Sequence, residues 1–316
     1  MPAKGLTAIP GVQVGHASDF DGLTGCTVVL FSGGAVGGVD VRGSATGTEE
    51  LTLLSPMHLT ERVHGVVLAG GSAFGLEAAS GVRRYLEHKG IGYETGAAKV
   101  PLVPAAILYD LAIGKASARP TREMGEVAAG AASSGPVAEG CVGAGTGATV
   151  GKVLGTDRAM KSGLGTAAVE MPGGVMVAAL AAVNAVGDVI DPKTGRIVAG
   201  ARTAKDSREF ANSAAALEQG TGRHGLNTTL VVVATNSRLN KVGAAKLAEF
   251  GSAGVARTIA PVWTMFDGDV TFGFSCGNAE ADINALGVAA ADAVSQAILR
   301  AVRLARSMGG LPGLAG

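Results

Sequence analysis

Residues 228–236 read Thr-Thr-Leu-Val-Val-Val-Ala-Thr-Asn, and this stretch decides how the rest of the chain is interpreted. Its β-branched and apolar residues predict a strand over Thr228–Thr235. Apolar side chains occupy both alternating sets of positions, so we expect this strand to be covered on both faces. The segment Val175–Asn184 has the same character. The fold should therefore contain a central sheet with further layers on both sides.

Apolar runs and helical spacing predict the other elements. Further strands are expected at Thr27–Phe31, Gly65–Ala69, Gly165–Met171 and Val270–Phe274. Helices are expected at Ser72–His88, Arg122–Ala132, Asp206–Gln219, Lys241–Phe250 and Ala281–Met308. Because the strands cluster in the middle and the helices flank them, we expect one α/β domain over residues 1–316, with helices packed on sheet.

The connection that enters the central strand has an unusual composition. It reads Gln219-Gly-Thr-Gly-Arg-His-Gly-Leu-Asn227, follows a predicted helix and contains three glycines. Such a segment is typical of an exposed, flexible loop. In a reaction at this junction, the segment before the broken bond would be mobile, and the attacking residue would stand at the start of a rigid strand.

The composition excludes several classes of protein. Gly accounts for 50 of the 316 residues and aromatic residues for 4%, with no G-X-Y period, so neither collagen nor disorder fits. This mixture instead predicts small side chains and closely packed backbones. The formal net charge is zero and no basic run occurs, so we expect no nucleic-acid partner.

The cysteines and the apolar segments favour a cytoplasmic protein. The three cysteines are scattered and show no CxxC spacing, so we expect neither a disulfide framework nor a zinc site. The first residues lack the long apolar run of a signal peptide. The most apolar late segment, Ala281–Met308, carries charges along its length, so we expect a soluble helix and no membrane contact.

Three glycine-containing segments approach familiar motifs without completing them. Val142–Ala148 contains a loose G-x-G-x-x-A, but neither a leading strand nor a following helix is evident. Gly151-Lys152 lacks the first Gly and the final Ser or Thr of a phosphate loop, and Gly70–Gly75 lacks the second Gly of a nucleophile elbow. The five histidines show no ligand-like pairing. We therefore expect no metal and no cofactor.

Two polar segments are compatible with ordinary structure as well as with catalysis. Thr in Asn227–Thr229 is typical of the start of a strand, and the Asp-Gly of Asp267–Asp269 is typical of a hairpin turn. Lys152 taken alone is typical of a solvated surface, and Asn184 of a strand-end cap. Both interpretations stay open on the residues alone.

A family resemblance connects these segments. The chain resembles the self-processing aminopeptidases typified by L-aminopeptidase D-Ala-esterase/amidase, and most of all their nylon-oligomer hydrolase branch. The landmarks, in the family's order along nearly the whole chain, are Ile9–His16, Leu68–Ala78, Ala106–Asp110, Gly145–Lys152, Val183–Gly187, Asn227–Thr229 and Asp267–Asp269. Each is weak alone, but together they are hard to explain by chance.

The resemblance implies a fold, a cleavage and an assembly. The fold would be a four-layer αββα sandwich similar to the N-terminal nucleophile hydrolases. The single domain would split into an α chain, residues 1–227, and a β chain, residues 228–316, which stay together. Members of the family form homo-oligomers of such αβ units, so a tetramer is expected.

The resemblance also implies catalytic roles. Thr228 would attack the carbonyl of Asn227, and its freed α-amine, with an ordinary pKa of about 7.7–8.0, would then act as a base. Lys152 would supply a positive charge near the nucleophile, and the Asn184 amide would donate to the oxyanion.

The remaining implied residues bear on the substrate. Asp267 and Asp269 would orient Thr228 and bind a substrate ammonium, since they flank a glycine and share one side of an extended chain. Tyr109 would supply a phenol donor.

The aminopeptidase branch carries Ser at the nucleophile, and Ser and Glu in place of the two aspartates. The Thr and Asp-Gly-Asp pattern therefore favours an amide hydrolase acting on short peptides or on ω-amino-acid oligomers such as those of 6-aminohexanoate. An aminopeptidase or esterase-amidase that releases N-terminal amino acids is the alternative. Action mainly on another acyl group and a non-enzymatic binding protein also stay open.

Overall fold

The computed structural model describes residues 5–222 and 227–315. The predicted flexible connection over Gln219–Asn227 lies partly outside the described residues, at 223–226. The main sheet contains β1 (Val12–Asp19), β2 (Thr24–Val41), β3 (Gly47–Glu49), β4 (Arg62–Ala69), β7 (Ala105–Ile107), β10 (Leu164–Met171), β11 (Val175–Asn184), β14 (Thr228–Ser237) and β16 (Val270–Ala279). The helices are α1 (Glu77–His88), α2 (Arg122–Gly130), α3 (Ser213–Glu218), α4 (Lys241–Thr258) and α5 (Ile283–Arg303).

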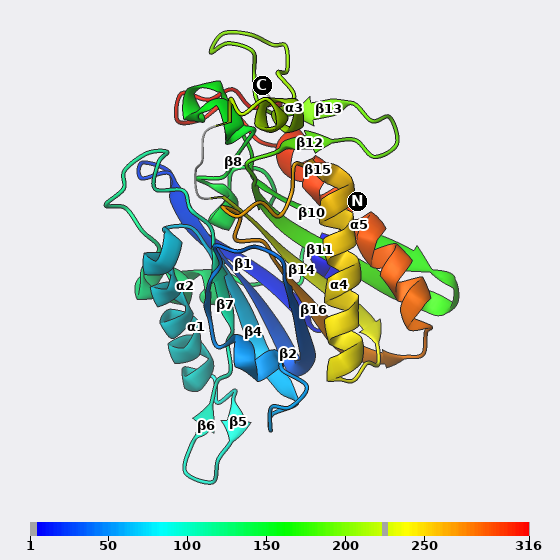
Figure 1. Cartoon of the computed structure of the whole chain (residues 1–316). Coiled ribbons are helices and arrows are strands. Elements are labelled where there is room, and N and C mark those ends of the chain that lie inside the picture. Colours follow the sequence, from blue (N-terminus) through cyan, green and yellow to red (C-terminus); the bar gives the residue numbers. More distant parts are fainter. Residues whose placement is uncertain (1–4, 223–226, 316) are drawn as a thin grey trace.

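Short strands form three small sheets beside the main one. They are β5 (Tyr93–Glu94) with β6 (Lys99–Val100), β8 (Thr149–Val150) with β9 (Met160–Lys161), and β12 (Asp188–Ile190) with β13 (Ile197–Ala199) and β15 (Ile259–Ala260). In Figure 1, β5 and β6 project at the bottom, whereas β8, β12, β13 and β15 gather at the top near the C-terminus.

The long strand β2 folds the main sheet into two layers. The strand order is β10-β11-β14-β16-β2-β4-β7-β3, with β1 also paired to β2. The first part of β2 pairs with β1, up to Phe31, whereas the part from Val36 onward pairs with β16. Its register against β4 shifts between Leu30 and Ala35, within a glycine-containing stretch. A break in register of this kind lets a strand bend from one layer into the next.

Three apolar cores show that the chain has four layers. Alternate residues of β14 face opposite ways: Val232 lies in a core between the two sheet layers, and Val233 in a core shared with α4 and α5. In β2, Val29 likewise joins the core between the sheet layers, whereas the adjacent Val28 packs toward α1 and α2. Figure 1 shows α1 and α2 on one side of the strands and α4 and α5 on the other. The prediction of an αββα sandwich is therefore confirmed.

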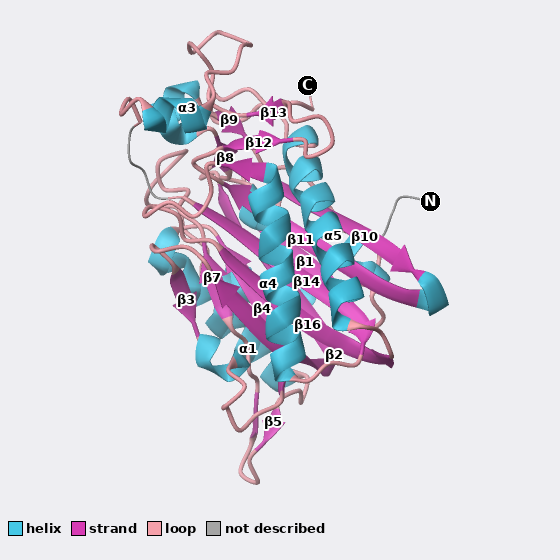
Figure 2. Cartoon of the chain, turned by 45° about the vertical axis from the view of Figure 1, so that its right-hand side comes forward, coloured by secondary structure: helices cyan, strands magenta, loops and turns pink. Residues whose placement is uncertain are grey.

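Glycines allow the helices to approach the sheet closely. A Cβ placed on Gly165 of β10 would lie 2.1 Å from the carbonyl oxygen of Ala297 in α5. A Cβ on Gly38 of β2 would lie 2.1 Å from the amide nitrogen of Ala245 in α4. Side chains at these positions would push the helices away, so close backbone contact takes the place of large aromatic side chains, which are few in this sequence. Figure 2 shows both helices lying along the strands.

The sequence predictions located most elements but not all of their ends. The expected helix over Asp206–Gln219 is wrong in its first half, because the helix begins only at Ser213. There the Asp188 carboxylate accepts hydrogen bonds from the Ser213 amide and hydroxyl, both at 2.6 Å, which anchors the helix start. Strand β1 was not predicted, and α4 continues to Thr258, eight residues past the expected end at Phe250.

Helix α5 is long and apolar enough to cross a membrane by length and composition alone, but most of it is buried inside this fold.

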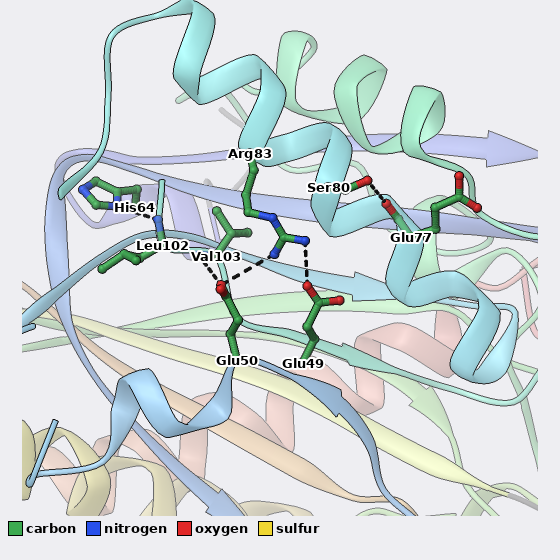
Figure 3. Close-up of polar contacts among 8 residues, drawn as sticks. All are labelled: Glu49, Glu50, His64, Glu77, Ser80, Arg83, Leu102 and Val103. Carbon is green, nitrogen blue, oxygen red and sulfur yellow. Dashed lines mark hydrogen bonds and ion pairs between the residues drawn. The ribbon is translucent and has the colours of Figure 1, made fainter. Parts of the chain in front are cut away.

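An ion-pair cluster ties the edge strand β3 to α1. Arg83 of α1 contacts Glu49 at 2.6 Å and Glu50 at 3.5 Å, and the Glu50 carboxylate also accepts from the Val103 amide at 3.3 Å (Figure 3). These side chains are about one-third exposed, so each ion pair contributes at most about 1 kcal/mol. The cluster therefore anchors β3, which follows the connection from β2. The start of that connection, at Arg42–Ala45, is hydrogen-bonded to Asp267 and Asp269.

Candidate active site

Thr228 is the first residue of β14 and is buried, with 3% of its surface exposed. Its hydroxyl donates a hydrogen bond of 2.5 Å to the carbonyl oxygen of Asn227, the residue before it. The strand is central in its layer, between β11 and β16. The hydroxyl therefore lies against the peptide group that joins Asn227 to Thr228, at the point where the chain enters a rigid strand.

The strands on both sides bring polar residues to this point. On one side, Asn184 ends β11 and is the direct antiparallel partner of Thr228. On the other side, Asn227 forms a parallel bridge with Asp267, and the Gly268 amide donates to the Asn227 carbonyl oxygen at 2.7 Å. The pairing of strands thus gathers residues that are about 40 positions apart in the sequence.

The side chain of Asn184 is the centre of a hydrogen-bond network. Its Oδ1 accepts from Lys152 Nζ at 2.7 Å, and from the Thr149 amide and hydroxyl at 3.1 and 3.3 Å. Its Nδ2 donates to the carbonyl oxygen of Tyr109 at 2.8 Å. Asn184 is fully buried, so these contacts fix the orientation of its amide.

Lys152 reaches the site from a tight turn rather than from the surface. Gly151 has a φ of 71°, and the Lys152 amide donates to the Val186 carbonyl at 3.0 Å, so the backbone aims the side chain at Asn184. Burial lowers the pKa of Lys152 to about 7, although the carboxylates of Asp267, Asp110 and Asp269 act in the opposite direction. The solvated-surface interpretation of Lys152 is therefore wrong.

The two aspartates are buried and close to each other. The Asp267 carboxylate accepts from the amide and hydroxyl of Thr264, at 2.8 and 2.7 Å. The Asp269 carboxylate accepts from the Thr229 amide at 2.5 Å. Burial raises both pKa values, and the Asp267 charge contributes to raising the pKa of Asp269 to about 7. One proton is therefore readily held by this pair near neutral pH.

The connection from β2 to β3 lies against the Asp-Gly-Asp segment. The amides of Arg42 and Gly43 both donate to the Asp269 carbonyl oxygen at 3.1 Å, and the Ala45 amide donates to the Asp267 carbonyl oxygen at 2.9 Å. The common hairpin interpretation of Asp267–Asp269 is therefore wrong, because this segment is held like a strand between two others.

Tyr109 contacts the site in a different way from that expected. Its carbonyl oxygen holds the Asn184 amide, whereas its phenol makes no hydrogen bond within the described part of the chain. The described residues likewise show no hydrogen bond between the Thr228 hydroxyl and either aspartate.

Sequence reasoning did not single out three groups that the structure places at the site. Thr149 holds Asn184, Thr264 holds Asp267, and the Gly268 amide holds the carbonyl oxygen of Asn227. The spacing Thr264-x-x-Asp267 is a signal for a local side-chain turn and could have identified Thr264. No comparable signal marks Thr149 or a backbone amide, because their roles depend on which strands pair.

The glycine-rich segment Val142–Ala148 has a structural role. The buried Lys161 ammonium donates to the carbonyl oxygens of Gly145, Ala148 and Ser162 at 2.6–3.1 Å. This contact holds the segment just ahead of Thr149 and Lys152. Within residues 5–222 and 227–315, no three His, Cys, Asp or Glu side chains are arranged to hold a metal ion.

A surface cavity of about 1040 Å³ lies elsewhere, between residues 202–210 and 307–314, and Thr228, Asn184, Lys152, Asp267 and Asp269 do not line it.

Comparison with solved structures shows the same fold. The L-aminopeptidase D-Ala-esterase/amidase of Ochrobactrum anthropi, described as a variant of the Ntn hydrolase fold, superposes with a TM-score of 0.75 at 21% identity, covering 98% of this chain and 89% of that one. A β-aminopeptidase of Burkholderia sp. superposes with a TM-score of 0.72 at 23% identity, covering 99% and 92%.

Sequence comparison shows the family. A protein of Mycobacterium leprae described as an uncharacterized aminopeptidase is 38% identical, over 98% of this chain and 93% of its own length. The 6-aminohexanoate-oligomer endohydrolase of Kocuria sp. strain KY2 is 33% identical, over 93% of this chain and 84% of its own length. The profile of peptidase family S58 matches residues 4–315. The chain therefore belongs to peptidase family S58, and it is a hydrolase of amide bonds.

Proposed function

We propose that this hydrolase activates itself by breaking the bond between Asn227 and Thr228, and that Thr228 is then the N-terminal nucleophile for amide substrates. The observation that carries the proposal is the buried Thr228 hydroxyl, 2.5 Å from the carbonyl oxygen of the preceding residue. A threonine placed merely for β-propensity needs no such contact, and no lysine and aspartate pair beside it.

Self-cleavage would follow an acyl shift. Thr228 Oγ1 forms a bond to the Asn227 carbonyl carbon, the bond from that carbon to the Thr228 nitrogen breaks, and the hydroxyl proton ends on that nitrogen. Water then hydrolyses the resulting ester, which leaves a carboxylic acid on Asn227 and restores the Thr228 hydroxyl. The same hydroxyl, with the new α-amine as base, would attack the carbonyl of a substrate amide.

The neighbouring charges suit this chemistry. Lys152 has its pKa lowered to about 7, so it can stabilise negative charge when protonated and lose its proton at little cost. We assign Asn184 to the oxyanion of the substrate reaction, and Asp267 and Asp269 to positioning around Thr228. Tyr109 retains its proposed role as a phenol donor to the substrate.

The two fragments should remain one domain. Strand β14 begins the β chain, yet it is hydrogen-bonded along its length to β11 of the α chain. The central core also combines Leu180 of the α chain with Val232 and Phe272 of the β chain. Separating the fragments would expose this core, so we propose a stable αβ unit, assembled further into a homo-oligomer, with a tetramer as the expected form.

Two substrate classes are supported to different degrees. The Thr and Asp-Gly-Asp pattern favours short peptides and ω-amino-acid oligomers, and the relative from Kocuria sp., a 6-aminohexanoate-oligomer endohydrolase, supports this choice. The aminopeptidase alternative is supported by the name of the Mycobacterium leprae relative, which has the higher identity. A panel of amino-acid p-nitroanilides and 6-aminohexanoate oligomers separates the two.

The cleavage itself is tested on a denaturing gel. Purified wild-type protein should yield fragments of about 22 and about 9 kDa, from 31.1 kDa shared between 227 and 89 residues. N-terminal sequencing of the small fragment should read Thr-Thr-Leu-Val-Val. A small fragment with any other start, or an intact active chain, would overturn the proposal.

A further inference from the structure

We propose that the backbone amide of Gly268 is the oxyanion donor for self-cleavage. This inference rests on the proposed function above and assigns one step of it. The Gly268 N–H donates to the carbonyl oxygen of Asn227 at 2.7 Å, and that oxygen carries the negative charge when Thr228 attacks. A backbone N–H aimed at a developing oxyanion is a strong catalytic contact when its position is set in advance.

The position of this amide is set from both sides of one peptide plane. In the peptide group that joins Asp267 to Gly268, the carbonyl oxygen accepts from the Ala45 amide at 2.9 Å, and the N–H donates to the Asn227 carbonyl oxygen at 2.7 Å. In a trans peptide these two groups point in opposite directions. The connection after β2 and the scissile peptide therefore hold the plane between them, and the amide cannot rotate away as charge develops.

A glycine is required at this position for steric reasons. A Cβ on Gly268 would lie 2.8 Å from Thr228 Oγ1 and 2.8 Å from the Ala45 carbonyl oxygen. Any side chain would therefore collide with the nucleophile or with the connection that orients the plane. The absence of a side chain lets the N–H lie directly beside the attacking hydroxyl.

Asn184 is arranged for a different task. In the uncleaved chain its Nδ2 donates to the Tyr109 carbonyl oxygen at 2.8 Å, and its Oδ1 accepts from Lys152 and Thr149. The Asn227 carbonyl oxygen is held instead by Gly268 and by Thr228 itself. Two oxyanion donors therefore serve two reactions: the Gly268 amide the self-cleavage, and the Asn184 side chain the substrate.

The test removes the N–H without adding a side chain. Cell-free translation with a glycolate-charged suppressor transfer RNA replaces the Gly268 amide by an ester, in which an oxygen stands in place of the N–H. We expect self-cleavage to slow by at least about 10²-fold, which is typical for loss of one oxyanion donor. The matched control places the same ester at Gly43, whose N–H donates to the Asp269 carbonyl oxygen beside a second donor, Arg42. The control should mature within about threefold of wild type.

Folding is followed separately, because both esters remove a hydrogen bond. In the Thr228→Ala background, which cannot cleave, the two ester chains should have melting temperatures within a few degrees of each other. If the Gly268 ester does not fold, the amide is examined in the unmodified Thr228→Ala chain by hydrogen exchange with ¹⁵N-glycine. Strong protection of Gly268 supports the bond, whereas exchange at the rate of a free peptide overturns it.

The outcomes distinguish this inference from the proposed function. If wild-type protein never cleaves between Asn227 and Thr228, both the proposed function and the Gly268 assignment are overturned. Wild-type cleavage together with a Gly268 ester that matures at the wild-type rate would overturn the oxyanion assignment alone. Slow self-cleavage of the Gly268 ester variant, together with a nearly wild-type rate for the Gly43 ester variant, supports the assignment.

Discussion

Asn184 and Thr228 face each other across the β11–β14 pair, the last residue of one strand against the first residue of the other. Lys152 lies at the same end of this strand pair, since Lys152 Nζ donates to both oxygens of Asn184, at 2.7 and 2.8 Å. A slip of one residue would turn the Asn184 side chain to the opposite face of the sheet. The pairing of these two residues is therefore what assembles the site.

The hydroxyl of Thr228 should be indispensable for maturation. Thr228→Val keeps the β-branched shape that suits the start of a strand but removes the nucleophile, so we expect a single uncleaved chain that is folded and inactive. Thr228→Ser keeps the hydroxyl and should still cleave. The neighbouring Thr229→Val is the control and should cleave as well. Fragments of about 22 and 9 kDa from Thr228→Val would contradict the assignment.

The Asn184 side chain should act in the transition state of the substrate reaction. Asn184→Ala should lower kcat by about 10²–10³-fold with little change in KM, measured on mature protein. Asn184→Asp keeps the acceptor for Lys152 but loses the amide donor, so it should show a similar loss of kcat with a smaller loss of stability. A loss confined to KM would instead make Asn184 a ground-state binding residue.

Protonation of Lys152 should set the pH dependence of maturation. Because burial lowers its pKa to about 7, the ammonium is lost as the pH rises through neutrality, and we expect the cleavage rate to fall above about pH 7. Lys152→Arg keeps the charge and should extend the rate to higher pH. Lys152→Met should be impaired throughout, unlike the exposed control Lys246→Met. A wild-type rate that rises through pH 7, with no such rise in Lys152→Arg, would show that the neutral amine is the active form.

Asp269 should make the precursor less stable as the pH rises. Burial and the charge of Asp267 raise its pKa to about 7, so the folded chain binds a proton that the unfolded chain releases above about pH 4. Its contribution is present at low pH and is lost between about pH 4 and pH 7. In the Thr228→Ala background, Asp269→Asn should therefore gain free energy of unfolding relative to its parent from pH 5 to pH 7.5, by urea titration. The exposed Asp292→Asn should show no such trend, and a flat difference for Asp269→Asn would contradict the raised pKa.

The two aspartates also decide between the substrate classes. We expect Asp267 and Asp269 mainly to orient Thr228, so both Asn variants should lose kcat equally on a free and on an N-acetylated amino-acid anilide. An enzyme that accepts internal amides should then show only a weak preference for the free amine. A preference above about 100-fold in kcat/KM, or about 2.7 kcal/mol, would favour the aminopeptidase alternative. Loss of that preference in one Asn variant would identify the ammonium-binding carboxylate.

The strands and helices with strong periodicity could be predicted from the sequence. Val175–Asn184 was located to the residue, and Thr228–Thr235 fell only two residues short of the end of β14, because both are unbroken apolar runs whose ends are marked by polar residues. The helix expected from Asp206 begins only at Ser213, where the Asn212 side chain caps it and the Asp188 carboxylate, brought there by the fold, accepts from the Ser213 amide. The bend of β2 was missed because its glycine-containing middle is typical of a loop.

The sequence by itself determined which residues stand at the junction: Thr228 after Asn227, and two aspartates around Gly268. Only the tertiary structure decided that these segments are neighbours, because β14 pairs in parallel with β16 and antiparallel with β11, contacts that local propensity does not encode. It also decided the pKa values of Lys152 and Asp269, since burial and nearby charge exist only in the folded chain. The donor on the Asn227 carbonyl oxygen is a backbone amide, and every residue but proline carries one, so only folding could select that of Gly268.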